Sequence, residues 1–408
     1  MRIFRCLVAA FCMMLCLASF GKGKAEIPIL AWYSIPTTEM TEERYLELKE
    51  AGFTISYSSI FSLEDALKAL ELGDKTGVKV LIYCRELFSD PENAVRELMA
   101  HPSLFGYSLG DEPSYKDFPT FAAAAERIRA IDSEHMLYMN LFPNYAPVGL
   151  LCSYEASDPL AGPYADYVRN FAEQVKLPML SFDHYPVTSG GVRREWWSNL
   201  EVVSRQAEVS GVPFWAFTLA TAHDPYPVAT MASMRLQLYT DLAYGAQGLQ
   251  YFTYWCPEST VWNFHEAPID LEGNKTQVYY LAKELNAEIQ ARADVFLGSK
   301  VLKVRHTGLS LPPGVTPLSE IPAPVTKFDT HGKGAVVSLL EKGKYHYMVV
   351  VNRSVDEAWD YDIEFSARAD RIGRDGKPSR IKAGKPLTFN LEEGDCAIYR
   401  WKAKYSKP

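Results

Sequence analysis

Two kinds of segment alternate along the chain in a regular order. Short apolar runs, rich in β-branched and aromatic residues, are each followed by a longer amphipathic stretch with helical spacing. The apolar runs predict eight strands, at 28–34, 53–58, 78–83, 104–109, 136–141, 178–182, 213–219 and 248–254. The amphipathic stretches predict eight helices, at 41–51, 62–72, 91–99, 118–131, 164–175, 194–209, 231–244 and 275–292.

This order predicts the fold class. Eight strand–helix units in about 250 residues are typical of an α/β protein with a (β/α)₈ TIM barrel. A doubly wound sheet would more often show fewer units and a glycine-rich first turn, and no GxGxxG occurs. Ser62 and Asp65 are suitably placed to begin the second helix.

The pattern changes near Gly298. Turn-forming residues separate short strands from there on, and apolar residues recur at every second position. This alternation predicts strands at 335–340, 345–351, 361–365, 387–391 and 396–401. We therefore expect a barrel domain over 26–297 and a small antiparallel β-sandwich domain over 298–408.

The first 25 residues have the pattern of a signal peptide. Arg2 and Arg5 form a basic start, and the apolar stretch 7–20 that follows is too short for a comfortable membrane span. The pattern predicts export to the periplasm or the cell exterior. Lipid anchoring through Cys12 or Cys16 is the lesser alternative, because neither has a convincing approach of small residues.

Composition narrows the classes of partner. A net charge of -8 and the lack of a basic run argue against nucleic acid, and no later apolar run is long enough to span a membrane. No Cys or His spacing suggests zinc, so no metal or other cofactor is expected. Disulfide pairing and the formation of homo-oligomers are left open. Outside the signal lie four scattered cysteines: Cys84, Cys152, Cys256 and Cys396.

The fourth predicted strand ends in two acids. The apolar run 104–109 is followed by Gly110, Asp111, Glu112 and Pro113. Gly110 lets the backbone turn, and the proline cannot continue the ladder. In a parallel α/β barrel this end of a strand is where chemistry takes place. The alternative is an aspartate that caps the following helix beside a solvated glutamate.

The other strand ends carry acids, amides, imidazoles and aromatic rings, which suit a neutral polyhydroxylated ligand such as an oligosaccharide. A phosphate site would need a glycine nest or a basic cluster. Two histidines in the set have an alternative reading as ordinary hydrogen-bonded polar residues, and the tryptophan at the eighth strand as a seal of the barrel rim. The candidate residues are Trp32, Tyr33, Arg85, Asn140, Asp183, His184, Tyr185, His223, Tyr254 and Trp255.

Hydrolysis of a glycosidic bond needs a proton donor for the leaving oxygen. Glu112 is the candidate donor, because the neighbouring Asp111 tends to keep it protonated. Consecutive strand residues point to opposite faces, so both acids reach one site only if Gly110 twists the end of the strand.

The segment 242–255, Leu-Ala-Tyr-Gly-Ala-Gln-Gly-Leu-Gln-Tyr-Phe-Thr-Tyr-Trp, is similar to the eighth-strand region of family 42 β-galactosidases. The resemblance implies a glycoside hydrolase with a clan-A-type barrel, but the sequence departs from that pattern twice. Clan A has Asn-Glu at the fourth strand, where this chain has Asp111 and Glu112. It also has a nucleophilic Glu at the end of the seventh strand, near the position of Thr218.

An Asp-Glu pair at the fourth strand also resembles families 20 and 123. Those enzymes act on N-acetylhexosaminides, and the acetamido group of the substrate is itself the nucleophile. The resemblance implies that Glu112 is the acid/base and that Asp111 orients the acetamido group. It also implies that Tyr185 or Tyr254 binds the acetamido oxygen.

Other functions stay open at this point. A retaining glycosidase would use Asp183 as its second carboxylate, or Glu258 in second place. The absent seventh-strand nucleophile is also consistent with a carbohydrate-binding protein on a degenerate barrel that has no activity. A lyase or esterase is the weakest alternative, because no GxSxG elbow occurs.

Overall fold

The computed structural model describes residues 25–58, 60–153 and 162–405 of the 408-residue chain. Apart from Ala25, the predicted signal peptide lies outside the described residues. Within those ranges no helix is both long and apolar enough to cross a membrane. No disulfide bond joins the four described cysteines.

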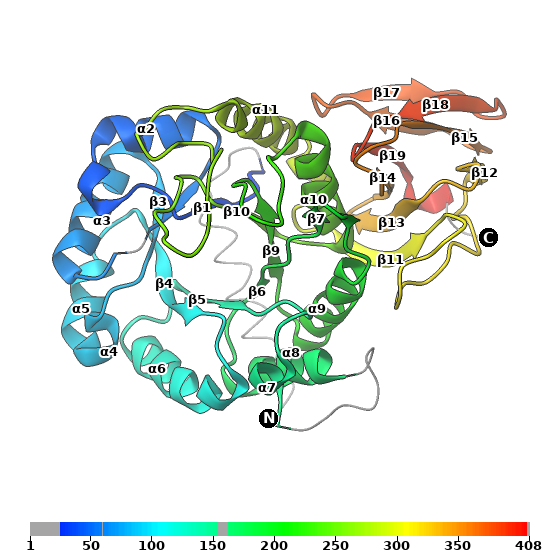
Figure 1. Cartoon of the computed structure of the whole chain (residues 1–408). Helices are drawn as coiled ribbons and strands as arrows, with labels where there is room; N and C mark the ends of the chain where they lie inside the picture. The colour runs from blue at the N-terminus through cyan, green and yellow to red at the C-terminus, as the bar shows by residue number, and fades with distance from the viewer. Residues whose placement is uncertain (1–24, 59, 154–161, 406–408) are drawn as a thin grey trace.

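Eight parallel strands close into a barrel, as the sequence predicts, and Figure 1 shows the helices as a ring around them. Around the barrel the strand order is β1-β10-β9-β6-β5-β4-β3-β2. The strands are β1 (Ile29–Trp32), β2 (Ile55–Tyr57), β3 (Lys79–Ile82), β4 (Leu104–Asp111), β5 (Met136–Leu141), β6 (Leu180–Phe182), β9 (Phe214–Leu219) and β10 (Gly248–Phe252). These strands all finish at the same end of the barrel, and we call that end the barrel mouth.

The eight predicted helices are present, with ends shifted by a few residues. As predicted, Ser62 begins the second of them, because its side chain accepts a hydrogen bond from the backbone N–H of Asp65. The large helices are α2 (Glu42–Glu50), α3 (Leu63–Thr76), α5 (Pro91–Leu98), α6 (Phe118–Ile131), α8 (Pro163–Gln174), α9 (Trp196–Ser210), α10 (Met231–Tyr244) and α11 (Gln277–Ala291).

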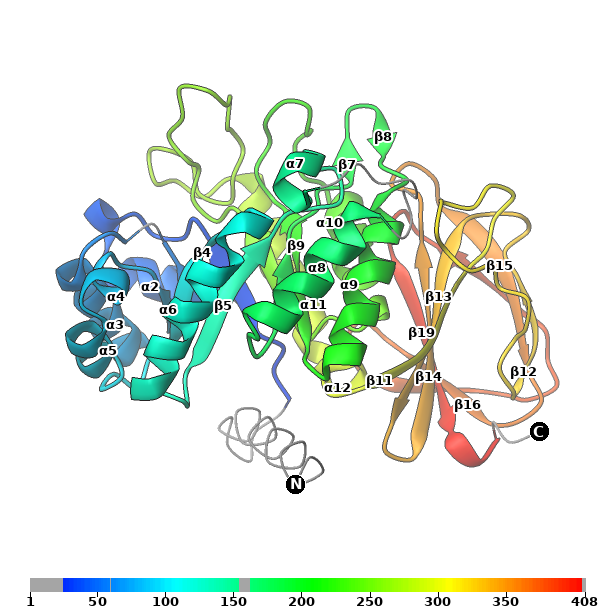
Figure 2. The same ribbon diagram turned by 90° about the horizontal axis from the view of Figure 1, so that it is seen from below.

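Shorter elements lie between them, and several surround the mouth. In Figure 2 the β7–β8 hairpin and α7 stand at the same end of the barrel. The short elements are α4 (Glu86–Ser89), α7 (Val148–Leu151), α12 (Ala293–Phe296), β7 (Val187–Thr188), β8 (Gly191–Val192) and the 3₁₀ turns η1 (Thr37–Glu39), η2 (Tyr115–Asp117) and η3 (Ala403–Tyr405).

The C-terminal region is the predicted antiparallel sandwich. A six-stranded sheet, β11-β13-β14-β19-β16-β17, packs on a three-stranded sheet, β12-β15-β18. Four strands beyond those expected are present, β11, β12, β16 and β17, which are short or carry few buried apolar residues. The strands are β11 (Lys300–His306), β12 (Val325–Asp329), β13 (Ala335–Lys342), β14 (Tyr345–Asn352), β15 (Trp359–Phe365), β16 (Ala369–Ile372), β17 (Pro378–Ile381), β18 (Leu387–Leu391) and β19 (Cys396–Lys402).

The central strands of the six-stranded sheet are buried on both faces. Along β14, Met348 and Val350 face the sandwich interior, whereas Val349 and Val351 join the core that surrounds the barrel. Helix α10 lies between this sheet and the barrel, and every residue from Ser233 to Tyr244 is buried. A helix covered on all sides belongs to the interior. The barrel and the sandwich therefore share one core.

A buried ion-pair network links these two parts of the chain. Glu288 on α11 accepts hydrogen bonds from Arg235 (2.8 Å), Arg292 (3.1 Å) and Tyr239 (2.5 Å). The Arg292 guanidinium also donates to the Gly373 backbone oxygen in the sandwich, at 3.1 Å. Burial makes such a network costly to break, because removing one partner leaves the opposite charge without compensation.

We therefore expect Glu288→Gln to lower the free energy of unfolding by about 3–5 kcal/mol in urea denaturation. The matched control is Lys283→Ala, on the same helix as Glu288. It removes an exposed ion pair to Glu50 of α2 and should lower the free energy of unfolding by less than about 1 kcal/mol. Equal effects of the two substitutions would show that the buried network does not hold the parts together.

Candidate active site

The end of β4 brings both acids to the mouth. The pairing of β4 with β5 shifts register between Ser108 and Asp111, which is a β-bulge. Gly110 within the bulge has φ of 149°, a value that side chains rarely allow, and Glu112 has φ of 45°. The twist expected at Gly110 is therefore present. A non-glycine residue in the left-handed region is strained, and such residues cluster at functional sites.

Asn140 on β5 holds the acids together. Its side-chain N–H₂ donates to Asp111 Oδ1 at 3.2 Å and to Asp183 Oδ1 at 2.9 Å. Glu112 and Asp183 share a side-chain hydrogen bond, and the Glu112 backbone N–H donates to the Asn140 backbone oxygen at 2.9 Å. Three carboxyl groups from two strands thus form one cluster.

A second layer of polar side chains orients Asn140 from inside the barrel. The Ser181 hydroxyl donates to Asn140 Oδ1 at 2.9 Å, which turns the amide N–H₂ toward the carboxyl groups. Ser181 in turn accepts from Gln250 Nε2 at 2.8 Å, and Tyr138 donates to Gln250 Oε1 at 2.6 Å. These four residues are buried, so each hydrogen bond also offsets the cost of removing polar groups from water.

The cluster resists ionisation. Burial is the main cause in each case: it raises the pKa of Asp111 to about 6 and, with the charge of Asp111, the pKa of Glu112 to about 7. Asp183 has its pKa raised well above the usual range by burial and by the other two acids. The Asp111 side chain is nevertheless still exposed to solvent. Near neutral pH, Glu112 and Asp183 therefore retain a proton between them.

Aromatic rings line the mouth beside the acids. The Trp32 ring lies 4.4 Å from Tyr57, 6.0 Å from Tyr138 and 5.2 Å from Phe217, measured between ring centres. Tyr185 packs 5.5 Å from Phe252. The apolar faces of sugar rings stack on surfaces of this kind.

Residues of the surrounding loops complete one wall. Arg193, beside the β7–β8 hairpin, lies 4.5 Å above the Tyr145 ring and donates to the Tyr226 hydroxyl at 3.3 Å. His184 is buried against Tyr145, and neither of its ring nitrogens has a hydrogen-bond partner among the described residues. Burial and the charge of Arg193 lower the pKa of His184 to about 3, so the imidazole is neutral.

The structure brings together most of the predicted site. Tyr33 stands at the rim with its side chain partly exposed, and His223 packs among rings of the wall. Arg85 is exposed beyond β3 and lies over the Phe61 ring. The predicted residues that gather around the mouth are Trp32, Tyr33, Asp111, Glu112, Asn140, Asp183, His184, Tyr185 and His223.

Besides Arg85, two predicted residues lie elsewhere. Tyr254 is fully buried in the layer between the barrel and its helices, and Trp255 packs under the Arg44 guanidinium of α2. Regular alternation along β10 ends at Phe252, and the Thr253 hydroxyl then turns the chain by donating to the Trp255 backbone oxygen at 2.7 Å. The aromatic side chain that β10 sends into the mouth is therefore Phe252, and Trp255 is a seal of the rim.

Several residues of the site were not singled out from the sequence. Tyr138 lies two positions before Asn140, so period-two alternation along β5 was a signal for it. Tyr145, Arg193 and Tyr226 lie on loops, where no periodic pattern indicates which way a side chain points.

No protein-family model matches the sequence, and no curated protein does. Among solved structures, a family 42 β-galactosidase from G. stearothermophilus aligns with a TM-score of 0.60 at 8% identity, over 92% of this chain and 98% of that one. The likeness establishes the fold. A γ-CGTase from alkalophilic Bacillus clarkii gives 0.52 at 9% identity, over 95% and 72%.

A β-galactosidase from Marinomonas ef1 gives a TM-score of 0.46 at 10% identity. The alignment covers 66% of this chain and 60% of that enzyme, so the chain spans less than two thirds of its length. The (β/α)₈ barrel fold that the resemblance implied is confirmed by the closed barrel and by the alignment with the G. stearothermophilus structure.

The raised pKa of Glu112 makes folding stability depend on pH. The folded state holds the proton up to about pH 7, whereas the unfolded state releases it near its ordinary value of about 4.3, so stability is lost as the pH rises between these values. Glu112→Gln cannot ionise. We expect its free energy of unfolding, relative to that of the wild type, to increase by on the order of 1–2 kcal/mol as the pH rises from 5 to 8.

Urea unfolding at both pH values measures this difference. Glu173→Gln, an exposed substitution on α8, is the control and should show no such change. A Glu112→Gln variant whose advantage is the same at pH 5 and pH 8 would contradict the shared proton.

Proposed function

We propose that the chain is an exported glycoside hydrolase that cleaves N-acetylhexosaminides with the help of the substrate's own acetamido group. Glu112 is the general acid and base, and Asp111 orients the acetamido group. The observation that carries the proposal is the hydrogen bond between Glu112 and Asp183, which places all three carboxyl groups of the mouth on one side.

This arrangement does not suit two carboxylates acting on opposite sides of a sugar. Retaining enzymes hold theirs about 5–5.5 Å apart and inverting enzymes about 6.5–9.5 Å apart, whereas Glu112 and Asp183 are in hydrogen-bond contact. Facing them, β9 ends in Thr218 and Leu219, and the four residues that follow carry no acid. Asp224, the next one, is exposed and hydrogen-bonded to Asn263. The nucleophile is then best supplied by the substrate.

The reaction divides into two steps. Glu112, protonated because of its raised pKa, donates its proton to the glycosidic oxygen while the acetamido oxygen attacks the anomeric carbon. The bond to the leaving group breaks, and a cyclic intermediate forms. Asp111 accepts a hydrogen bond from the acetamido N–H and stabilises the positive charge that develops there. A water molecule then gives its proton to the Glu112 carboxylate, opens the ring and restores the starting state.

The remaining residues of the mouth have supporting roles. Asn140 keeps Asp111 and Asp183 in place, and burial together with the charge of Asp111 keeps the proton on Glu112. Trp32 and its neighbouring rings form the platform for the sugar. Of the two tyrosines considered for the acetamido oxygen, Tyr185 lines the mouth and Tyr254 does not.

A carbohydrate-binding protein without activity is the second candidate. The missing acid at the end of β9 favours it, because a barrel that has lost its nucleophile retains the platform and the hydrogen-bonding groups. Its ligand would bind at the same mouth without being cleaved.

We expect aryl N-acetylhexosaminides to be hydrolysed and the matching plain hexosides to be inert. Glu112→Gln should lower kcat by about 10²–10⁴ because the proton donor is lost. Glu173→Gln, an exposed substitution on α8, is the control and should leave the rate unchanged. Equal cleavage of plain hexosides, or a sugar trapped covalently on Asp183, would exclude substrate assistance. Binding without turnover would support the second candidate.

The activity should also depend on pH through Glu112. Because its pKa is raised to about 7, the proton needed for the first step is lost above that value, so kcat/KM should fall as the pH rises through about 7. A pH profile of the wild type should show this alkaline limb. The residual activity of Glu112→Gln should lack it, and a limb that persists in the variant would assign the proton to another group.

A further inference from the structure

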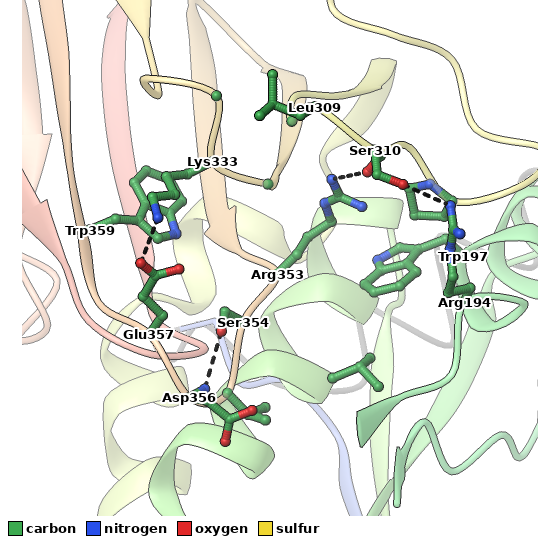
Figure 3. A pocket seen from close by; sticks show the side chains of 16 residues that line it. Arg194, Trp197, Leu309, Ser310, Lys333, Arg353, Ser354, Asp356, Glu357 and Trp359 are labelled. Atoms are coloured by element: carbon green, nitrogen blue, oxygen red, sulfur yellow. Dashed lines mark hydrogen bonds and ion pairs between the residues drawn. The ribbon is translucent and has the colours of Figure 1, made fainter. Parts of the chain in front are cut away.

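A hollow lies outside the barrel mouth, between the start of α9 and the sandwich. It has a volume of about 380 Å³, and Figure 3 shows the side chains that line it. Trp197 comes from the barrel side, and Arg353 and Trp359 come from the sandwich side. We call this hollow the interdomain groove.

The floor of the groove presents donors that lack acceptors. Trp197 is buried, and the Arg353 guanidinium lies 5.5 Å from the centre of its ring. The Trp197 Nε1–H and the Arg353 Nε–H are both inaccessible to solvent and have no hydrogen-bond partner among the described residues. A buried donor without a partner costs free energy, and these two donors leave the floor of the groove electropositive.

The positive charge of the groove is not neutralised. No ion pair within the described ranges joins Arg353 or Arg194 to a carboxylate. Arg353 donates instead to the backbone oxygen of Thr307 at 2.6 Å, and Arg194 to the Ser310 hydroxyl at 3.2 Å. Burial and the nearby Arg194 lower the pKa of Arg353 to about 10.

The two acids that line the groove do not supply the missing charge. Glu357 is paired with Lys333 at 2.5 Å, and Asp356 points away from both guanidinium groups in Figure 3. The groove therefore offers two unpaired arginines next to tryptophan rings. Guanidinium groups bind oxyanions in a fork geometry, and aromatic surfaces bind sugar faces.

We propose that the interdomain groove binds the carboxylate of a hexuronate residue in the same glycan whose N-acetylhexosamine occupies the barrel mouth. That the bound carboxylate belongs to a sugar rests on the glycoside hydrolase function proposed above. The substrate class is then an acidic oligosaccharide in which N-acetylhexosamine and hexuronate alternate.

The chain connects the two sites directly. Arg193 contacts Tyr145 and Tyr226 at the mouth, and the very next residue, Arg194, faces the groove. Val192, at the end of the β7–β8 hairpin, also lines the groove. Because one short strip of backbone separates the sites, a single extended glycan chain can lie across both.

Calorimetric titration of the full chain tests the proposal. The Glu112→Gln variant is used as the background, so that binding is measured without turnover. We expect an oligosaccharide of alternating N-acetylhexosamine and hexuronate to bind about tenfold or more weakly when Arg194→Gln or Arg353→Gln is added. Arg380→Gln, on the exposed strand β17, is the matched control and should change nothing.

Arg353 also donates to a backbone oxygen, so Arg353→Gln could fail to fold. Arg194 is more exposed, and Arg194→Gln then still tests the proposal. Affinity for the neutral N-acetylhexosamine oligosaccharide should be the same in all variants. Unchanged affinity for the acidic oligosaccharide in both arginine variants would overturn the proposal. So would tighter binding of a sulfated oligosaccharide, or of inorganic phosphate alone.

The outcomes separate this proposal from the catalytic one. Arginine-dependent binding of the acidic oligosaccharide without any hydrolysis by the wild type would contradict the catalytic function and support the groove. Hydrolysis of aryl N-acetylhexosaminides with arginine-independent binding would contradict the groove and support catalysis.

Discussion

The side-chain amide of Asn140 positions the acids at the centre of the barrel mouth. Asn140 donates to carboxyl groups from two different strands, and Ser181, Gln250 and Tyr138 fix its orientation from inside the barrel. Three acids so close together would repel one another if all were ionised. In this buried network a shared proton therefore has a lower free energy than three charged carboxylates. The closed barrel contributes the rest of the constraint, because parallel strands bring their carboxyl ends to the same rim.

The same barrel needs support on one flank. Helix α10 is apolar or buried on every side, so it cannot face water as an ordinary barrel helix does. The six-stranded sheet covers it, and Gly394 allows the approach: a Cβ there would lie 2.0 Å from the backbone oxygen of Ala232. The Glu288 network then fixes the orientation of the two parts with charge-assisted hydrogen bonds.

Much of this arrangement could be predicted from the sequence, because periodicity reports burial. The apolar run before Gly110 and the alternation from Ala335 onward both mark elements correctly. Side-chain direction after a strand ends could not be predicted in this way. Tyr254 and Trp255 follow the last regular residue of β10 and turn outward. The partnership of Asp183 with Glu112 also depends on strand pairing across the barrel, which one sequence does not encode locally.

The two-sided burial of α10 has a consequence for how the chain can be divided. The apparent domain border near residue 298 separates two kinds of secondary structure, but it does not separate two independent folding units. A barrel ended at that border would present the outer face of α10 to water, and Arg235 would lose its ion-pair partners Glu392 and Asp395 in the sandwich. The sheet is in effect the last layer of the barrel. Unfolding should therefore be a single cooperative event, and the two halves could not be exchanged between proteins as modules.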